Sequence, residues 1–467
     1  MIITRFAPSP TGDPHIGNIR TALFVYLFAK HNNGKFLLRI EDTDRKRHDD
    51  TSIGTIIDAL EWLEIIPDNI DNPMIQSERL EIYRKKAFEL VGQNKAYVCT
   101  CTPEELKASR EKMVKAGQAP MYSGKCRNSK LEIKNSKLPD NAVIRMKVPK
   151  GEKISFTDAI RGNVKFSTDT IDDQVILKSD GYPTYHLAHI IDDHEMGITD
   201  VIRSEEWLPS TPKHIILNKM VGFKVPNYAH LPIILGSDRS KLSKRDGAVG
   251  ILEYRKLGYL PEALINFMAF LGWNPKDERE FFTLAELEGE FDLENVNKAG
   301  AIFDIEKLNH YNRHYLREKS VDEIIKLIDR DALQRFEKFD TEKVVSLAKE
   351  RMEKLADFEE TVSFLLEAKP EAKILIFKKS DKDKTIAGLK VASEKIEIVK
   401  DFSNQNIKSA LEETVSQNNL ANGDVFWPVR VALSGLATSP PPEQIAEVLG
   451  KEETLSRIKT AIKILSP

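Results

Sequence analysis

The N-terminal part of the chain combines a short apolar run, a loop rich in proline, a helical pattern and a second apolar run. Residues 2–6 have the pattern of a buried strand, and residues 7–14 contain three prolines and Gly12, which favour a tight turn. Apolar positions recur at helical spacing from residue 16 to about 29, and residues 35–40 again suit a strand. This order is typical of a βαβ unit, so we expect an α/β fold with a doubly wound parallel sheet.

Ligands of such sheets bind beyond the carboxyl ends of the strands. Residues 7–18 follow the first predicted strand, and the sequence Glu-Asp-Thr-Asp at residues 41–44 follows the second. We therefore expect both segments to line one crevice.

The length of 467 residues exceeds what one hydrophobic core supports, because cores stop growing beyond about 250–300 residues. Several domains are therefore expected. Ser320 to Glu323 has the sequence of a capping box, and the pattern beyond it is almost entirely helical, including a tract from Val344 to Leu366. The main boundary is predicted near residue 320, between residues 1–319 and 320–467.

The charge is nearly balanced over the whole chain, with 69 lysines and arginines against 72 acidic residues. This excludes a uniformly cationic nucleic-acid binder but allows a local cationic patch. Residues 106–151 hold 12 basic residues and three acidic ones. Such a run is either a solvated loop or an inserted domain that contacts a phosphate backbone.

The chain has three cysteines, Cys99, Cys101 and Cys126, and this odd number does not suit a disulfide framework. We expect a reducing compartment. The sequence has no basic leader with an apolar segment and no run of 18 apolar residues, which predicts a cytoplasmic protein that does not contact a membrane. The cysteine spacing is compatible with one tetrahedral zinc ion, and three free thiols are the alternative interpretation.

Two short motifs suggest the binding of phosphate groups. His15-Ile-Gly-Asn18 begins the first predicted helix, where backbone N–H groups attract anions, and His15 could donate a hydrogen bond to a phosphoryl oxygen. Lys241-Leu-Ser-Lys-Arg245 places three cations in one loop, which suits a mobile clamp on triphosphate. Taken separately, a helix-capping histidine and an exposed basic turn are the simpler interpretations.

Together, the two motifs resemble the signatures of class I aminoacyl-tRNA synthetases, and longer motifs resemble the bacterial glutamyl-tRNA synthetase family. These motifs are R-F-A-P-S-P-T-G-D-P-H-I-G-N (5–18), R-I-E-D-T-D (39–44), S-D-G-Y-P-T-Y-H-L-A (179–188), V-I-R-S-E-E-W-L-P-S-T-P-K-H (201–214) and, more weakly, P-V-R-V-A-L-S-G (428–435). The resemblance covers nearly the whole chain. It implies a Rossmann-type catalytic region in residues 1–319, with an acceptor-stem-binding insertion at about 80–190 and a helical stem-contact region at about 250–319. An all-α anticodon-binding domain would follow in residues 320–467.

The resemblance implies ATP-dependent attachment of L-glutamate to the 3' end of tRNA(Glu) through a glutamyl-adenylate, with Mg²⁺ accompanying ATP. It assigns catalysis to His15, Lys241 and Lys244. It assigns ATP binding to Pro10, Gly12, His15, Gly17, Asn18, Lys241, Ser243 and Lys244. It assigns glutamate binding to Arg5, Ala7, Ser9, Glu41, Tyr185, His189 and Arg203, where arginines can grip carboxylates and Glu41 can take the ammonium group.

Three further assignments follow from the resemblance. Tyr122 would complete a structural zinc site with Cys99, Cys101 and Cys126, because the position where relatives often carry histidine is Asn128 here. Arg351 would contact the first anticodon base and favour tRNA(Glu) over tRNA(Gln), although an exposed helix charge is the simpler interpretation. We expect a monomer.

One residue departs from the family pattern. His189 stands where related enzymes usually carry asparagine, which leaves the recognition of the glutamate side chain open. His186, His189, Asp193 and His194 also have a spacing that a metal site would allow, but such residues are more often capping groups. Asp42 and Asp44 form an Asp-x-Asp pair that suits a divalent ion, a structural loop or a ribose-side contact.

Competing functions remain at this stage. The nearest is an enzyme that charges both tRNA(Glu) and tRNA(Gln) with glutamate. A catalytically silent tRNA-binding paralogue is disfavoured by the intact His15, Lys241 and Lys244, and a metal-dependent hydrolase built on His186 and His194 is the most distant alternative. A shorter relative that modifies a tRNA base lacks the C-terminal domain, and the length of this chain argues against it.

Overall fold

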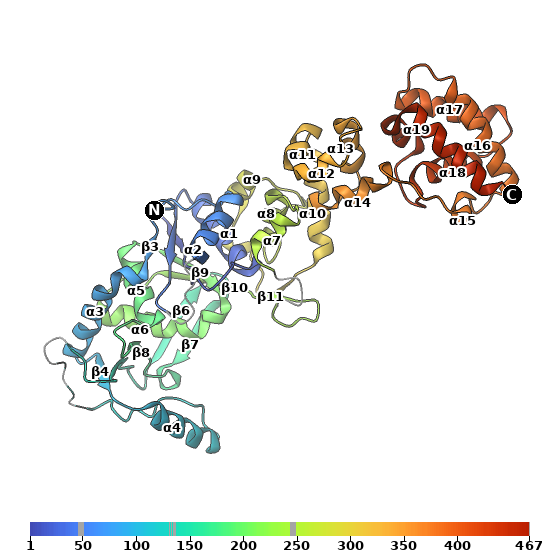
Figure 1. Cartoon of the computed structure of the whole chain (residues 1–467). Helices are drawn as coiled ribbons and strands as arrows, with labels where there is room; N and C mark the ends of the chain where they lie inside the picture. The colour runs from blue at the N-terminus through green and yellow to red at the C-terminus, as the bar shows by residue number, and fades with distance from the viewer. Residues whose placement is uncertain (45–50, 130, 132, 134–136, 243–248, 467) are drawn as a thin grey trace. The chain divides into compact units, whose positions relative to one another are not determined.

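The computed structural model of the chain describes residues 1–44, 51–129, 131, 133, 137–242 and 249–466 (Figure 1). It forms two compact units. The first comprises Met1–Arg255 and Pro261–Leu308, and the second comprises Lys256–Leu260 and Asn309–Pro467. Within the described residues, none of the helices has the length and apolar character needed to cross a membrane.

The βαβ unit predicted at the N-terminus is present. Strands β1 (Ile3–Phe6) and β2 (Lys35–Ile40) are parallel, and helix α1 (Ile16–His31) connects them. The turn before β2 requires glycine, because a Cβ atom at Gly34 would come within 2.3 Å of the Ile2 carbonyl oxygen.

A second parallel group continues the sheet arrangement. Strand β9 (Asp200–Ser204) is parallel to β10 (Asn227–Leu231), which is parallel to β6 (Lys153–Asp158), and β7 (Gly162–Ser167) pairs antiparallel with β6. The Thr199 backbone N–H, just before β9, donates to the Ile3 carbonyl of β1 at 2.9 Å. The carboxyl ends of β1, β2 and β9 therefore lie on the same side of the unit.

An antiparallel sheet lies in the chain between helices α3 (Leu80–Gly92) and α5 (Tyr185–Glu195). It has the strand order β4 (Ala96–Cys99), β5 (Val143–Met146) and β8 (Val175–Leu177). Helix α4 (Pro103–Lys115) follows β4, buries no side chain, and projects beyond it in Figure 1. The core of this part includes the buried Tyr83, Met146 and Leu187.

The remaining elements of the first unit are short. They are α2 (Thr51–Trp62), β3 (Met74–Ile75), α6 (Thr211–Val221), β11 (Ile234–Leu235), α8 (Pro261–Ala269), α9 (Leu284–Glu290) and β12 (Ala301–Ile302). Two helices have residues in both units: α7 (Ile251–Lys256) and α10 (Ile305–Glu318).

The second unit is helical beyond α10, as the sequence predicts. Its elements are α11 (Val321–Leu327), α12 (Arg330–Gln334), α13 (Thr341–Lys349), α14 (Phe358–Val362), α15 (Ala372–Leu375), α16 (Lys382–Glu397), α17 (Asn404–Gln417), α18 (Asn422–Ser434) and α19 (Pro442–Leu465). The predicted capping box is present, because the Ser320 hydroxyl accepts from the Glu323 N–H.

The continuous helical tract predicted from Val344 to Leu366 is wrong. Helix α13 ends at Lys349, and a new turn begins near Leu355. The Asp357 carboxylate accepts the backbone N–H groups of Glu353 and Lys354 at 3.1 and 3.0 Å, so it caps this new turn in place of a continued helix. Arg351 consequently lies just beyond α13 rather than on a helix.

Candidate functional site

A cavity of about 820 Å³ lies at the carboxyl ends of β1, β2 and β9 and beside β11. Eleven residues assigned from the sequence line it: Arg5, Ala7, Ser9, Gly12, His15, Gly17, Asn18, Glu41, Tyr185, Arg203 and Lys241. The structure thus brings together residues that are more than 200 positions apart. The buried Pro10 and His189 do not line this cavity, and Ser243 and Lys244 lie outside the described residues.

His15 stands at the start of α1. Its Nδ1 accepts the Gly17 backbone N–H at 3.0 Å and so caps the helix. The pKa of His15 is lowered, first by desolvation and second by the positive charge of Lys241, so the imidazole is neutral at pH 7. The start of α1 lines the cavity, and the positive end of the helix dipole would stabilise an anion there.

Lys241 lies at the opening of the cavity. The Leu242 N–H donates to the Ile234 carbonyl at 3.0 Å, which fixes the start of the lysine-rich loop against β11. The Lys241 ammonium contacts the Glu206 carboxylate at 2.6 Å, and both side chains are more than half exposed, at 63% and 51%. Such an exposed ion pair is weak, so Lys241 is free to contact another anion.

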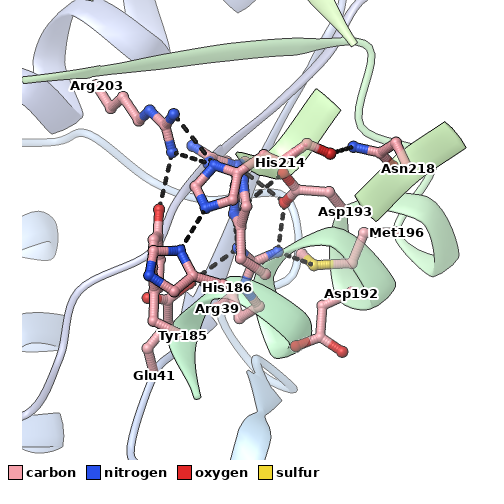
Figure 2. A network of polar contacts seen from close by, with 12 residues as sticks. Arg39, Glu41, Tyr185, His186, Asp192, Asp193, Met196, Arg203, His214 and Asn218 are labelled. Atoms are coloured by element: carbon pink, nitrogen blue, oxygen red, sulfur yellow. Dashed lines mark hydrogen bonds and ion pairs between the residues drawn. The ribbon is translucent and has the colours of Figure 1, made fainter. Parts of the chain in front are cut away.

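Arg5, which lines the cavity, and the fully buried Arg39 share one carboxylate. The Asp193 Oδ1 accepts from Arg5 Nε at 3.0 Å and from Arg39 Nη1 at 2.6 Å. Figure 2 shows Arg39 and Asp193 in this network. Arg39 also donates to Glu41 Oε1 at 2.9 Å. Burial alone would raise the pKa of Asp193, but the two guanidinium groups hold it below its ordinary value.

Glu41 presents the second carboxylate of this wall. Burial raises its pKa, and the ion pair with Arg39 opposes that shift. Because Glu41 lines the cavity, its carboxylate can accept a cationic group of a ligand.

Tyr185 and Arg203 form another part of the wall. Arg203 Nη1 donates to the Tyr185 hydroxyl at 2.9 Å. The Tyr185 ring lies between Trp207, at 4.3 Å between ring centroids, and His189, at 5.1 Å with nearly parallel planes. His189 therefore packs against the Tyr185 ring and does not line the cavity.

The Asp-x-Asp pair is placed as part of a loop. Asp42 is buried and accepts the Ser77 backbone N–H at 2.8 Å, and neither Asp42 nor Asp44 lines the cavity. This contact favours the structural interpretation of Asp42.

The histidine-rich helix α5 does not form a metal site among the described residues. His186 Nδ1 lies 3.0 Å from His214 Nε2, a direct hydrogen bond that leaves no room for an ion between them. His194 is exposed and stacks on Phe223 at 3.7 Å between centroids. In the described ranges, the cysteines are the one set whose ligand atoms lie close enough to hold a metal.

The three cysteines converge next to Tyr122. Their Sγ atoms all lie within 4.8 Å of one another, and Cys101 Sγ is 3.5 Å from Cys126 Sγ. The Tyr122 hydroxyl oxygen lies 3.4 and 3.6 Å from the sulfurs of Cys99 and Cys101. Ligands about 2.0–2.3 Å from a tetrahedral zinc ion are separated by roughly 3.5–3.8 Å, so this set fits zinc. Asn128 is exposed and outside the cluster.

Arg351 is exposed in the second unit. Desolvation lowers the pKa of Arg351, the charge of Glu350 opposes this shift, and the positive charge of Arg430 adds to it. Arg430 stacks over Trp427 at 4.5 Å. A guanidinium stacked over an aromatic ring is a kind of surface that suits an unstacked nucleotide base.

Sequence reasoning missed several residues of the first unit's site. Trp207 and Glu206 line the cavity, and Arg39, Asp193 and His214 hold its wall. For Asp193, the sequence offered one clue to its place in the site. Asp193 is four residues after His189, so the two side chains share a face of α5.

The chain is similar to known proteins over nearly its whole length. Residues 1–310 match the family model described as the catalytic domain of class I tRNA synthetases (E and Q), and residues 315–462 match an anticodon binding domain. A glutamate–tRNA ligase of Dehalococcoides mccartyi is 43% identical over 99% of this chain and 97% of its own length. Glutamate–tRNA ligase 2 of Thermoanaerobacter pseudethanolicus is 43% identical over 99% and 98%.

A solved structure is also similar to this chain. The crystal structure of a glutamate tRNA ligase from Elizabethkingia meningosepticum, in complex with its amino acid, superposes with a TM-score of 0.86 at 37% identity. The similarity covers 100% of both chains.

The contacts of Asp193 with Arg5 and Arg39 predict that a substitution of this residue strongly lowers stability. Asp193→Asn leaves Arg5 and Arg39 without their shared carboxylate, so we expect the free energy of unfolding of the first unit to fall by about 3–5 kcal/mol. Urea denaturation measures this loss. Asp180→Asn is the control, because the Asp180 pair with Lys178 is exposed and 3.7 Å long and should contribute less than about 1 kcal/mol.

The lowered pKa of Asp193 determines how its contribution to stability changes with pH. Because the folded-state pKa of Asp193 lies below the ordinary 3.8, its stabilisation is complete above that value and is lost as the pH falls through the folded pKa. The difference between the wild type and Asp193→Asn should therefore shrink below pH 3.8. A difference that is small at pH 7 would contradict the role of Asp193.

Proposed function

The chain belongs to the glutamate–tRNA ligase family of class I tRNA synthetases, and we propose on this premise that its cavity activates glutamate with ATP and transfers it to tRNA(Glu). One observation carries the proposal. A single cavity is lined by the start of α1, by the guanidinium groups of Arg5 and Arg203, and by the Glu41 carboxylate. That combination suits a triphosphate beside an acidic amino acid.

The proposed glutamate site contains Arg5, Ala7, Ser9, Glu41, Tyr185 and Arg203, all of which line the cavity. Arg203 and Arg5 supply guanidinium donors for carboxylates, and Glu41 accepts the ammonium group. His189 acts through Tyr185, on whose ring it stacks, and this placement makes the replacement of asparagine compatible with glutamate binding.

The proposed ATP site follows the first strand and includes Pro10, Gly12, His15, Gly17, Asn18 and Lys241. Five of these line the cavity, and Pro10 fixes the loop behind them. Ser243 and Lys244 continue the lysine-rich loop and complete the assignment. Mg²⁺ accompanies ATP as part of the substrate.

The reaction has two transfers. The α-carboxylate of glutamate attacks the α-phosphorus of ATP, and pyrophosphate leaves. The 2'-hydroxyl of the terminal adenosine then attacks the carbonyl carbon of the adenylate, and AMP leaves. His15 and the lysines stabilise charge on the phosphoryl oxygens, and the remaining residues orient the reactants.

The proposed tRNA contacts lie outside the cavity. Helix α4 carries Lys107, Arg110, Lys112 and Lys115 in the insertion at about 80–190, which we assign to the acceptor stem. Residues about 250–319 would contact the stem, and residues 320–467 would bind the anticodon through Arg351. We place the enzyme in the cytoplasm, where translation occurs, as a monomer.

Aminoacylation tests the function directly. With labelled glutamate, ATP and Mg²⁺, we expect charging of purified tRNA(Glu) and none of tRNA(Gln). Arg351→Gln should extend charging to tRNA(Gln), because the guanidinium that discriminates the first anticodon base is lost. Charging of both tRNAs by the wild type would identify the non-discriminating enzyme. Charging of neither would contradict the proposal and favour a silent paralogue.

His15 provides a sharper test of the chemistry. His15→Ala should lower kcat by roughly 10²–10³ and leave the substrate KM values nearly unchanged, because a donor to the transition state is removed. His31→Ala is the matched control on the same helix, since His31 is exposed at its other end. Steady-state kinetics distinguish the outcomes, and a change confined to KM would refute the assignment.

The zinc site is proposed on its geometry. Cys99, Cys101, Cys126 and Tyr122 would hold one structural Zn²⁺, which would link β4 to the segment that follows α4. Elemental analysis of protein purified without chelator should give about one zinc per chain, and Cys101→Ser should lose most of it. Asn128→Ala, outside the cluster, is the control. A wild-type content far below one would leave three free thiols.

A further inference from the structure

Arg203 differs from the other arginines of the cavity wall in what surrounds its charge. It is buried, with 6% of its surface exposed, and its partners are all neutral. These are Tyr185 Oη and Thr211 Oγ1 at 2.9 Å, His230 Nε2 at 3.2 Å and His214 Nδ1 at 3.3 Å. Among the described residues, no carboxylate pairs with this guanidinium, whereas Arg5 and Arg39 both contact Asp193.

The partners of Arg203 fix the proton positions on two histidines. A guanidinium only donates, so His214 Nδ1 and His230 Nε2 must accept. His230 Nδ1 therefore carries the proton and donates to Asp158 Oδ2 at 2.5 Å. His214 Nε2 likewise carries a proton and donates to His186 Nδ1 at 3.0 Å, as the contact in Figure 2 shows.

The surroundings keep these rings uncharged. Burial is the first cause that lowers the pKa of His214 and of His230, and Arg203 lowers both further. The Asp158 carboxylate opposes the shift at His230, whose pKa nevertheless stays below its ordinary value. The charged or titratable groups facing His214 are His186, His189 and Asp193 of α5, together with Arg203 of β9. Those facing His230 are Asp158 of β6, Arg161 and Arg203.

The neutral partners of Arg203 leave its positive charge uncompensated. A carboxylate at either histidine position would neutralise the guanidinium within the protein. Neutral nitrogen acceptors instead fix its orientation through hydrogen bonds and leave its positive charge for a ligand. Arg203 lines the cavity, so that charge faces the space where a substrate carboxylate would lie.

We propose that His214 and His230 are positioning residues that hold Arg203 oriented and unneutralised for the side-chain carboxylate of the substrate. The inference rests on the proposed function, in which Arg203 binds glutamate. It extends that function by assigning the selectivity for an acid over its amide to two histidines behind the arginine.

Two substitutions of equal shape at residue 214 test the inference. His214→Asn places a neutral amide oxygen near the Nδ1 position, and His214→Asp places a carboxylate there. We expect His214→Asn to keep the KM for glutamate within about threefold of the wild type. His214→Asp should raise it at least about tenfold, with the KM for ATP unchanged, because the arginine then has an internal counter-ion.

The same test can be made at His230, which lies on strand β10. His230→Gln keeps an acceptor near the Nε2 position, and His230→Glu adds a charge, so the same contrast is expected. This pair keeps the inference testable if a variant at residue 214 fails to fold. His194→Leu, on α5 but away from Arg203, should leave both KM values unchanged.

The variant Arg203→Gln distinguishes a failure of this inference from a failure of the proposed glutamate site. If this variant raises the KM for glutamate while the charged and neutral histidine variants behave alike, glutamate binding by Arg203 stands and the inference is overturned. If Arg203→Gln leaves the KM for glutamate unchanged, the proposed glutamate site fails and the inference fails with it.

Discussion

The carboxylate of Asp193 is the interaction on which the cavity wall depends. It accepts from Arg5, 188 residues earlier in the chain, and from Arg39, 154 residues earlier. These contacts tie the ends of β1 and β2 to helix α5. Because both guanidinium groups are buried, the ionised Asp193 carboxylate compensates most of the cost of removing them from water, and Glu41 adds to this at Arg39. The Asp193 carboxylate thus joins the N-terminal βαβ unit to helix α5, in addition to the backbone bond between Thr199 and Ile3.

The arginines around the cavity differ in how far their charge is compensated within the protein. Arg39 contacts two carboxylates, Arg5 contacts one, and Arg203 contacts neutral acceptors only. An anion entering the cavity gains most beside the charge that is least compensated. Under the proposed function, a substrate carboxylate is therefore directed to Arg203, and Glu41 accepts the ammonium group. This order explains how a wall with several cations can select one orientation of a small acidic ligand.

The parts of the site that the sequence predicted are the local ones. The strand, loop and helix at residues 2–31 depend on prolines, Gly12 and helical spacing within a short segment, so their pattern was visible. The roles of Asp193 and His214 depend on contacts between distant segments, which no spacing encodes. The failure after Lys349 has a different cause, since Asp357 caps a new turn although the apolar spacing continues. At the cysteine cluster the spacing predicted three ligands, whereas Tyr122 entered through the family resemblance.

The phosphate side of the cavity combines fixed and movable groups. The His15 imidazole accepts the Gly17 N–H, and this bond fixes its orientation at the start of α1. Lys241 is exposed, and its ion pair with Glu206 contributes little to stability. A triphosphate can draw Lys241 from Glu206 at small cost, and the flexible side chain can follow pyrophosphate as it separates. Under the proposed function, the fixed groups at the start of α1 stay where the adenylate forms, the exposed Lys241 accompanies the leaving pyrophosphate, and Glu206 pairs with Lys241 when no phosphate is bound.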